Sequence, residues 1–528
     1  MTDPHVASLL PPEGAVSGFG RPGAAEVTPS VRRSLSRPAA GRLLACAGVL
    51  LAGCALQPPP APDEVRKDAL GEMNLNSPWR AGGAAGEVQD NWLVSFGDTQ
   101  LNALVTEALQ RNPDLRVAAA RVEQASSQLA LAKSAQRPSL TLLGTGGIKM
   151  SDMSSALTGV IALVSWELDL WGTLRYATAA ASDTFVAAQA DQEFARQSLA
   201  ATTAKAWFTV AQTRLEQKLA EQMLGSGEQL YGLAGDRLRV GAGNAQDVAL
   251  ANANLNYQRD VVAQARFAHE SARRALELLL GRYPSAELQA RENLPALPGP
   301  VPAGLPLQML ERRPDLIAAE RRVAAAFNRV GQAKTASLPS LRLTGNVGYL
   351  DSDILQLKQD YENPSAGVGA KIVAPIDING QTDAQVAGRT AQQQEAVAQY
   401  ARLALRAIGD VENALSAGRM LAEREKLLSA LVDDRTQAYD LAQSSYKVGR
   451  QDLRSVEQQQ LNLYEAQILL LRVRSEQLSQ RVGLHLALGG SFASPPSSNS
   501  ARAQDGAPVA QIKAIPSSPE GARRAPGT

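Results

Sequence analysis

Two stretches of the chain alternate apolar and polar residues with a period of two, the pattern of β-strands with two different faces. In the second stretch the apolar positions are Leu341, Leu343, Gly345, Val347 and Tyr349, then Val368, Ala370, Ile372, Ala374 and Ile376. The first stretch keeps the same phase at Leu140, Leu142, Val160, Ala162, Val164, Trp166 and Leu168. Each strand has roughly the 9 to 11 residues that cross a bilayer when tilted. The pattern predicts β-hairpins at about 139–170 and about 340–377.

Long helical segments follow each hairpin. No proline interrupts the 67 residues from Thr382 to Val448 (448 − 382 + 1), and a continuous helix of that length would reach about 100 Å. The return segments carry apolar residues at spacings of three and four, which is typical of coiled-coil packing. Helical hairpins are therefore predicted at about 176–281 and about 382–489. Helix continuity is expected to be weaker in the first, at Gly225, Gly227, Gly232 and Gly235.

The chain contains one unit twice. Asn112-Pro113-Asp114-Leu115 recurs as Arg313-Pro314-Asp315-Leu316 at an offset of 201 residues (314 − 113). Val240-Gly241 recurs as Val448-Gly449 at an offset of 208 residues (448 − 240). The second copy has therefore gained 7 residues (208 − 201) between these motifs, and such an insertion is tolerated best at a loop tip.

Four strands cannot close a barrel by themselves, because the smallest membrane barrels have about eight. An open sheet edge in lipid leaves unpaired backbone groups, which is costly. If the strands lie in a membrane, the protein must therefore oligomerise. The alternation alone is equally compatible with two hairpins packed in a soluble sheet, and the lipid anchor predicted below favours the membrane.

Composition and charge exclude several classes of function. The chain has 53 Lys and Arg against 52 Asp and Glu, a formal net charge of +1, so no global field attracts nucleic acid. Aromatic residues make up only 4%, which together with abundant Ala, Leu, Gln and Arg favours long helices. The three histidines and two cysteines are scattered without ligand spacing. This spacing argues against a zinc cluster, a thiol redox pair or another resident metal.

No enzyme and no cofactor are predicted, because the sequence has no Ser-His-Asp order, phosphate-binding glycine loop or metal cluster. Asp169 and Asp377 recur at the ends of the two β-hairpins. They are predicted to cap the helices that begin after Gly172 and Gly380.

The N-terminus has the features of an export signal. Several arginines, the last of them Arg42, precede 11 apolar or small residues from Leu43 to Gly53, a length too short to span a bilayer. The stretch ends in Leu51-Ala52-Gly53-Cys54, which resembles the bacterial lipoprotein signal, whose cysteine is lipidated and becomes the new N-terminus. We predict lipidation at Cys54, and we place Cys46 within the apolar core of the signal.

These patterns predict the following organisation. Residues 1–53 are the signal peptide, with an N-terminal extension that suggests an over-called start codon. Residues 54–90 hold the lipid anchor and a Pro-rich spacer. The two repeats occupy residues 91–300 and 301–490. The tail 491–528, rich in Ser, Pro, Ala and Gly, is predicted to be disordered.

From about Cys54 to Gly490 the sequence resembles the TolC-like outer membrane factors, specifically the NodT-type lipoproteins of multidrug efflux systems. The resemblance rests on the lipobox, on the order of the motifs and on their duplication. Besides the motifs given above, it is carried by Asn91-Trp92-Leu93-Val94-Ser95-Phe96-Gly97-Asp98 and by Ser165-Trp166-Glu167-Leu168-Asp169-Leu170-Trp171-Gly172.

The resemblance implies a mainly α fold with membrane β-structure, in which each chain is an internal structural duplication. It implies a homotrimer with four strands per chain in a twelve-stranded β-barrel, continued across the periplasm by a long α-helical coiled-coil barrel. It also implies delivery to the outer membrane, consistent with the absence of Asp after Cys54. The expected function is a passive duct that carries drugs or other small toxic compounds from a periplasmic adaptor, the membrane fusion protein, and an inner-membrane pump of RND type.

The resemblance also assigns roles to the helix-breaking turns. Val240, Gly241, Val448 and Gly449 would meet the adaptor tips. Asp247 matches an acidic position of the family's periplasmic gate, whereas its counterpart at 455 (247 + 208) is Ser455. Asp452 and Glu457 are expected to substitute for the missing acid, and Arg450 and Arg454 to pair with Asp247. Ordinary solvated charges near helix ends remain the alternative for these side chains.

Two other functions are compatible with the sequence. The chain resembles the exit ducts of type I protein-secretion systems nearly as well, although lipidation and the Trp171-Gly172 motif favour efflux. A lipid-anchored periplasmic coiled-coil scaffold without a pore would have the same helices, but its hairpins would not enter lipid.

Overall fold

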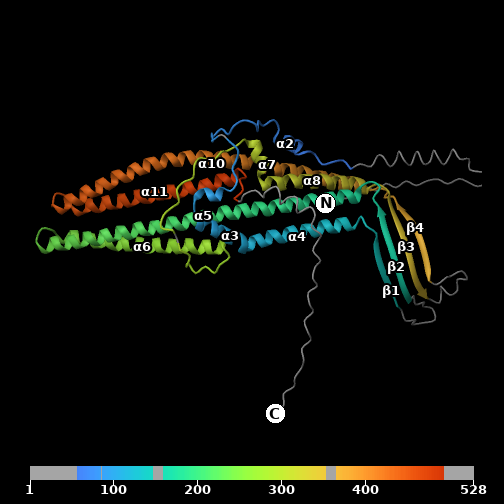
Figure 1. The fold of residues 1–528 in the computed structure, drawn as a ribbon, viewed down its shortest axis with the longest axis horizontal. Coiled ribbons are helices and arrows are strands. Elements are labelled where there is room, and N and C mark those ends of the chain that lie inside the picture. The colour runs from blue at the N-terminus through green and yellow to red at the C-terminus, as the bar shows by residue number, and fades with distance from the viewer. Residues whose placement is uncertain (1–55, 85, 147–157, 290, 352–363, 493–528) are drawn as a thin grey trace, which may run out of the picture. The chain divides into compact units, whose positions relative to one another are not determined.

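The computed structural model describes residues 56–84, 86–146, 158–289, 291–351 and 364–492 (Figure 1). These residues belong to one compact unit that begins at Leu56. The predicted signal peptide, the lipidation site Cys54 and the tail beyond residue 492 lie outside the described residues. No helix in the described ranges is both long and apolar enough to cross a bilayer.

The two repeats have the same order of elements, each with two helices, two strands and two longer helices. The first repeat consists of α3 (Thr99–Arg111), α4 (Pro113–Ser134), β1 (Ser139–Thr145), β2 (Thr158–Leu168), α5 (Thr173–Arg239) and α6 (Ala245–Leu279). The second consists of α7 (Pro306–Arg312), α8 (Pro314–Ala336), β3 (Ser340–Asp351), β4 (Ser365–Val373), α10 (Gln381–Lys447) and α11 (Leu453–Ala487). The paired long helices α5 and α10 both have 67 residues, and α6 and α11 both have 35.

Local sequence signals set these boundaries. Pro113 and Pro314 occupy the first turns of α4 and α8, where the missing N–H has no intrahelical partner to lose. Gly241 and Gly449 follow α5 and α10 with φ of +74° at both positions, a left-handed conformation that glycine adopts without steric cost.

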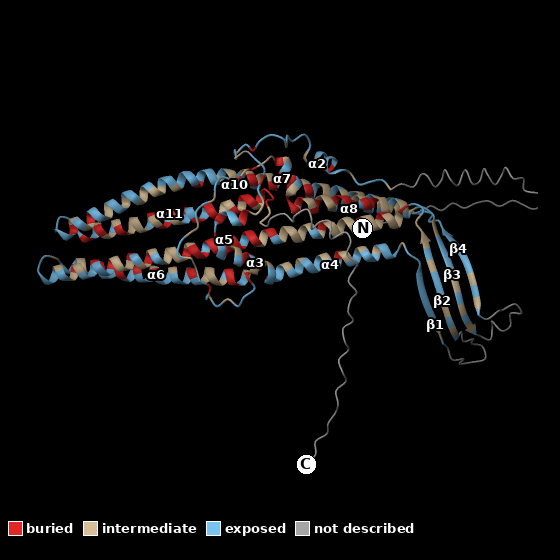
Figure 2. Ribbon diagram, viewed as in Figure 1, coloured by how far each residue is buried: buried red, intermediate tan, exposed pale blue. Residues whose placement is uncertain are grey.

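The helices pack side by side in an order that changes along α5. Near the strands, α5 lies between α4 and α8, and α8 in turn contacts α10. Farther from the strands, α5 contacts α6 and α11, and α11 contacts α10 (Figure 1). Buried residues follow these facing sides, whereas the strands are largely exposed (Figure 2). The two repeats therefore interleave in one body.

The glycines of α5 do not interrupt the helix, contrary to the sequence-based expectation. At Gly227 a Cβ atom would lie 1.9 Å from Oε1 of Gln258 on α6. Glycine here lets α6 approach closely, and this tertiary packing outweighs the lower helix propensity of glycine.

The segment predicted as a spacer is in part a packed structure. It includes the helix α2 (Pro62–Leu70), and a short 3-10 helix, η1 (Trp92–Phe96), follows it at the start of the first repeat. Trp79 is buried, and its indole N–H donates to the carbonyl of Ala303 at 3.0 Å. The Glu412 carboxylate on α10 accepts the backbone N–H groups of Arg80 and Ala81. These apolar and polar contacts hold the segment on the second repeat.

Candidate functional site

The four strands form one antiparallel sheet in the order β1-β2-β3-β4. Register places the apolar residues of all four strands on one face: Leu142 opposes Ala162, Ala162 opposes Val347, and Val347 opposes Ala366. This face packs against no other described element, and the side chains of Leu140 and Val368 are 73% and 96% exposed. A continuous apolar surface of this kind needs a nonaqueous partner.

The opposite face of the sheet is polar along β3 and β4 and mixed along β1 and β2, where Leu143, Ile161 and Leu163 share it with Thr141 and Ser165. Glu167 on β2 and Arg342 on β3 are register partners and form an ion pair at 2.8 Å, and Lys371 on β4 lies directly opposite Arg342. Thr344 and Asn346 continue this face along β3 and oppose glycines on β4. The sheet is therefore apolar on one side and more polar on the other, with its charged and amide side chains on the side away from Leu142 and Val347.

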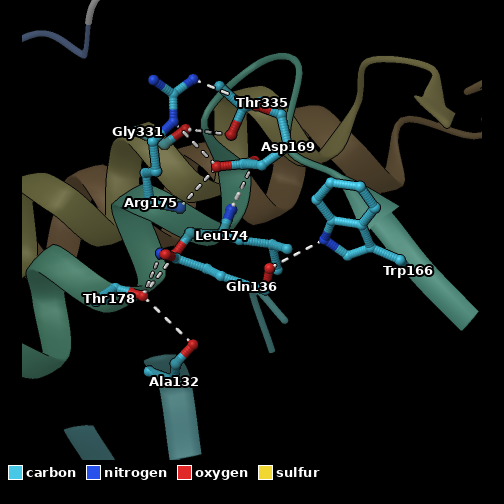
Figure 3. A network of polar contacts seen from close by, with 9 residues as sticks. All are labelled: Ala132, Gln136, Trp166, Asp169, Leu174, Arg175, Thr178, Gly331 and Thr335. Carbon is cyan, nitrogen blue, oxygen red and sulfur yellow. Dashed lines mark hydrogen bonds and ion pairs between the residues drawn. The ribbon is translucent and has the colours of Figure 1, made fainter. Parts of the chain in front are cut away.

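A polar network joins the first hairpin to the helices (Figure 3). The Asp169 carboxylate accepts the backbone N–H groups of Leu174 and Arg175, both at 2.9 Å, and binds the Arg175 guanidinium at 3.1 Å. Trp166 donates its indole N–H to the carbonyl of Gln136, whose side-chain amide donates to Thr178 on α5.

Asp377 makes the equivalent cap in the second repeat. Its carboxylate accepts the N–H groups of Gln381 and Thr382, and these backbone hydrogen bonds, that of Thr382 foremost, hold its pKa below the usual value. The predicted capping roles of Asp169 and Asp377 are confirmed, and these caps fix the angle at which strands become helices.

The other end of α5 and α10 carries the two predicted docking turns. Val240 and Val448 are exposed, and Gly241 and Gly449 follow them in the left-handed conformation. The four helices that meet here share a small apolar core. The core is made up of Leu230, Ala234, Ala251, Ala442, Tyr446, Leu453 and Val456. Both turns therefore project from a cluster that ties the two repeats together.

The predicted gate residues lie around this core. Asn244 caps α6 by accepting the N–H of Asp247 at 2.8 Å, and Asp452 caps α11 by accepting the N–H of Ser455 at 2.9 Å. Arg450 and Arg454 are exposed. Within the described part of this chain, neither arginine forms an ion pair with Asp247. The structure thus gives Asp452 a local capping role, and leaves both arginines accessible.

Glu457 and Asp247 share one electrostatic environment. Burial raises the pKa of the Glu457 carboxyl, a hydrogen bond from Asn254 opposes that rise, and the negative charge of Asp247 adds to it. Burial also raises the pKa of the Tyr446 phenol, which Arg237 opposes and both carboxylates reinforce. The two acids and the tyrosine are therefore coupled at the tip.

Arg237 and Tyr446 are functional candidates that the sequence patterns did not indicate. The Arg237 guanidinium on α5 donates to the main-chain carbonyl of Tyr446 on α10 and lies 4.7 Å from the centre of its ring. A second guanidinium nitrogen donates to the carbonyl of Ala242 in the first turn at 3.2 Å. Because the partners are 209 residues apart in sequence, no local periodicity signals the contact.

Two buried glutamines form a second polar connection between the repeats. Gln258 on α6 donates to the side chain of Gln460 on α11 at 3.2 Å, and Gln460 donates to the carbonyl of Met223 at 2.9 Å. Buried amides are costly without partners, so this arrangement favours one register between the hairpins. Gln258 and His269 are polar residues among the apolar positions that α6 carries at spacings of three and four. A ring nitrogen of His269 lies 3.2 Å from the Thr213 hydroxyl.

An amphipathic sheet carried by paired helical hairpins is the architecture of an outer membrane channel. The solved structure of the outer-membrane channel OprN superposes on this chain with a TM-score of 0.70 and 27% identity, covering 79% of this chain and 95% of OprN. The described elements thus define an outer membrane factor with a helical body and a β-domain.

Residues 104–282 and 305–490 match the family model described as outer membrane efflux protein, and the chain belongs to this family. It is 29% identical over 466 residues to the antibiotic efflux pump outer membrane protein ArpC of Pseudomonas putida, covering 85% of this chain and 95% of ArpC. It is 28% identical over 472 residues to the pyoverdine export outer membrane protein OpmQ of Pseudomonas aeruginosa, covering 85% of this chain and 97% of OpmQ. The family resemblance drawn from the sequence is confirmed.

Proposed function

We propose that this protein is the outer membrane duct of a tripartite efflux system and that it works as a homotrimer. The observation that carries the proposal is the four-stranded sheet, with one apolar face and an opposite face that carries its charged and amide side chains. The outer edges of β1 and β4 have no partner strand among the described residues. Three copies joined edge to edge would form a closed twelve-stranded barrel, which removes the unpaired edges that lipid does not tolerate.

The lipid anchor, the docking turns and the cargo class complete this proposal. Cys54 is the lipid attachment site that anchors the mature chain at the outer membrane. The exposed turns at Val240-Gly241 and Val448-Gly449 are the docking points for a periplasmic adaptor, which connects the duct to an inner-membrane pump of RND type. The names of ArpC and OpmQ associate those relatives with antibiotics and with pyoverdine. We therefore assign small toxic compounds, drugs among them, as the cargo class.

The periplasmic end is held closed by polar links at the tip. Within a chain, Arg237 ties α5 to Tyr446 of α10. Between chains, Arg450 and Arg454, both exposed, pair with the Asp247 carboxylate of a neighbouring copy. Asp452 and Glu457 add negative charge to the same constriction.

Single-channel recording tests the duct and its gate together. The purified wild-type protein is expected to insert into planar bilayers as a trimer of low conductance, and the pair Asp247→Ala with Arg450→Ala should raise that conductance. Arg435→Ala, on α10 farther from the turn, is the matched control and should leave the conductance unchanged. An unaltered conductance in the double variant would remove the proposed gate, and failure of the wild type to conduct at all would favour the scaffold without a pore.

Cysteine cross-linking tests the trimer separately. The only cysteines in the sequence are Cys46 and Cys54, so a pair introduced as Thr141→Cys on β1 and Gly369→Cys on β4 reports on the joined edges alone. Oxidation should give a covalent trimer, whereas each single variant should stay monomeric on denaturing gels. Products no larger than a monomer from several such edge pairs would contradict the closed barrel.

A further inference from the structure

A cavity of about 630 Å³ lies where α8 meets the end of α11, and helices α5, α8, α10 and α11 all contribute to its walls. Four cations and three anions are among the side chains that line it. The docking turns and the strands contribute nothing to it. The cavity is therefore separate from the features that the proposed function uses.

The three anions are already paired. Arg313, which is buried, binds the Asp315 carboxylate at 2.8 Å and approaches the Asp410 carboxylate to 3.9 Å. Arg322 forms an ion pair with Asp191. These pairs involve two of the four cations, and each carboxylate of the lining has an arginine partner.

Lys205 on α5 and Arg406 on α10 are the two remaining cations. Their side chains form no hydrogen bond or ion pair within the described residues; Lys205 is half-buried, Arg406 is exposed, and both line the cavity. The Lys205 ammonium lies beside Gly483 of α11, where an added Cβ would be 3.4 Å from Nζ. Burial without a compensating charge lowers the pKa of Lys205. Two helices thus present positive charge to a space that contains no free anion of the protein.

The first repeat lacks three of these charges at its equivalent positions. Arg313 corresponds to Asn112 (313 − 201), Arg406 to Ser198 (406 − 208) and Asp410 to Thr202 (410 − 208). At these three positions the charges occur only in the second copy, whereas Asp315 and Arg322 correspond to Asp114 and Arg121, and Asp191 and Lys205 lie on α5 of the first copy. Arg406, one of the two cations without a partner, is therefore not a requirement of the fold that both copies share.

We propose that this cavity is a binding site for a small multivalent oxyanion, held by Lys205 and Arg406. Charge-assisted hydrogen bonds from an ammonium and a guanidinium suit phosphate or carboxylate oxygens. The side-chain amide of Gln480 also lines the cavity and supplies a neutral donor. The available volume admits a ligand larger than a single phosphate group.

Calorimetric titration of the full-length protein in detergent tests the site, with inorganic phosphate and citrate as probes at constant ionic strength. One saturable site per chain is expected, and the tighter of the two probes identifies the preferred oxygen chemistry. Lys205→Met and Arg406→Gln should each weaken binding about 10-fold or more, because each removes a charge-assisted contact. Lys218→Met on α5 and Arg402→Gln on α10 are exposed matched controls and should bind like the wild type.

A second measurement separates lost binding from lost folding. Without added anion, Lys205→Met should unfold at a higher temperature than the wild type, since it removes an uncompensated cation from a partly buried position. Saturating anion should also slow the reaction of Lys205 with an amine-specific reagent. Absence of saturable binding for both probes, or equal binding by wild type, Lys205→Met and Arg406→Gln, would overturn the assignment.

Discussion

The two repeats reach the same backbone geometry at one joint with different chemistry. In the first repeat, the amide of Asn112 donates to the carbonyl of Leu279 at 3.0 Å, and its oxygen caps α4 by accepting the N–H of Asp114. In the second repeat the equivalent residue is Arg313, which donates to the carbonyl of Ala487 at 3.3 Å and pairs with Asp315. A neutral cap and a buried ion pair thus support the same end-to-end stacking of helices.

The glycines that close these joints are interchangeable in geometry. Gly281 and Gly489 have φ of +70° and +73°. A Cβ atom would lie 3.0 Å from the Arg111 carbonyl oxygen at Gly281 and 3.1 Å from the Arg313 nitrogen at Gly489. The close backbone approach is therefore what duplication preserved, while the side chains around it diverged.

The largest difference is expected when each joint loses its side chain. Arg313→Ala leaves Asp315 without its partner at a largely buried position, which should cost about 3 to 5 kcal/mol. Asn112→Ala removes a helix cap and one hydrogen bond, for a loss of about 1 to 2 kcal/mol. Thermal unfolding of the helices by circular dichroism ranks the two variants.

Arg313→Asn is the matched variant, because it installs the chemistry of the first repeat in the second. It should recover about 1 kcal/mol relative to Arg313→Ala by capping α8 as Asn112 caps α4. Equal midpoints for Arg313→Ala and Asn112→Ala would show that the ion pair adds nothing to the joint.

A second contrast concerns position 277 and its counterpart 485 (277 + 208), both buried. Glu277 accepts the backbone N–H groups of Ala286, Glu287 and Leu288. His485 instead stacks on Trp92, with ring centres 5.7 Å apart. One copy therefore buries an anion with three donors, and the other buries an aromatic ring.

Acid is expected to weaken the second repeat through His485. Burial, with a smaller effect of Arg481, lowers the pKa of His485 to about 4 from an ordinary value of 6.5. Above pH 6.5 the imidazole is neutral in both the folded and the unfolded chain, so burying it carries no protonation penalty and its contribution to the free energy of unfolding is fully present. As the pH falls from 6.5 to 4, His485 becomes protonated in the unfolded chain but stays neutral in the folded chain. The free energy of unfolding therefore falls by up to about 3 kcal/mol.

The unfolding midpoint as a function of pH checks this expectation. His485→Gln should flatten the profile between pH 6.5 and 4. His269→Gln should change it in the same direction, because burial also lowers the pKa of His269. A profile for His485→Gln that retains the wild-type slope would assign the acid sensitivity to other groups.

The smallest effect is expected at the helix caps beside the docking turns. Asn244→Ala and Asp452→Ala should each cost about 1 kcal/mol, because each removes the acceptor of one backbone N–H. The free energy of unfolding of Asp452→Asn should stay within about 0.3 kcal/mol of the wild-type value, because asparagine caps helices as well as aspartate does. Channel recording of the same variant then isolates the charge: an altered conductance assigns Asp452 to the gate, whereas an unchanged one leaves it a cap.

Much of the fold could be predicted from the sequence because its signals are local. The period-two alternation placed the strands in one phase, so the register of the sheet puts Leu343 opposite Trp166 and Ala370. The proline-free stretch after Thr382 anticipated a helix of 67 residues. The prediction that the glycines of α5 weaken the helix was wrong, because their effect on helix stability depends on the side chains that pack against them.

The candidate sites were less accessible to sequence reasoning. The positions of Asp247 and Glu457 near the turns follow from the repeat, but their electrostatic coupling through Tyr446 does not. The contact of Arg237 with Tyr446 links two helices from different repeats. Each such pair is defined by packing rather than by spacing along one helix.

The sequence by itself determined the duplication, the strands, the long helices and the glycine turns, because each depends on the conformations available to neighbouring residues. Only the tertiary structure decided how the copies interlock, which buried polar groups find partners, and which cations remain unpaired in the cavity beside α11. Those outcomes depend on contacts between residues about 200 positions apart, where burial removes water and makes each missing partner costly. The same backbone joint could therefore carry Asn112 in one repeat and Arg313 in the other.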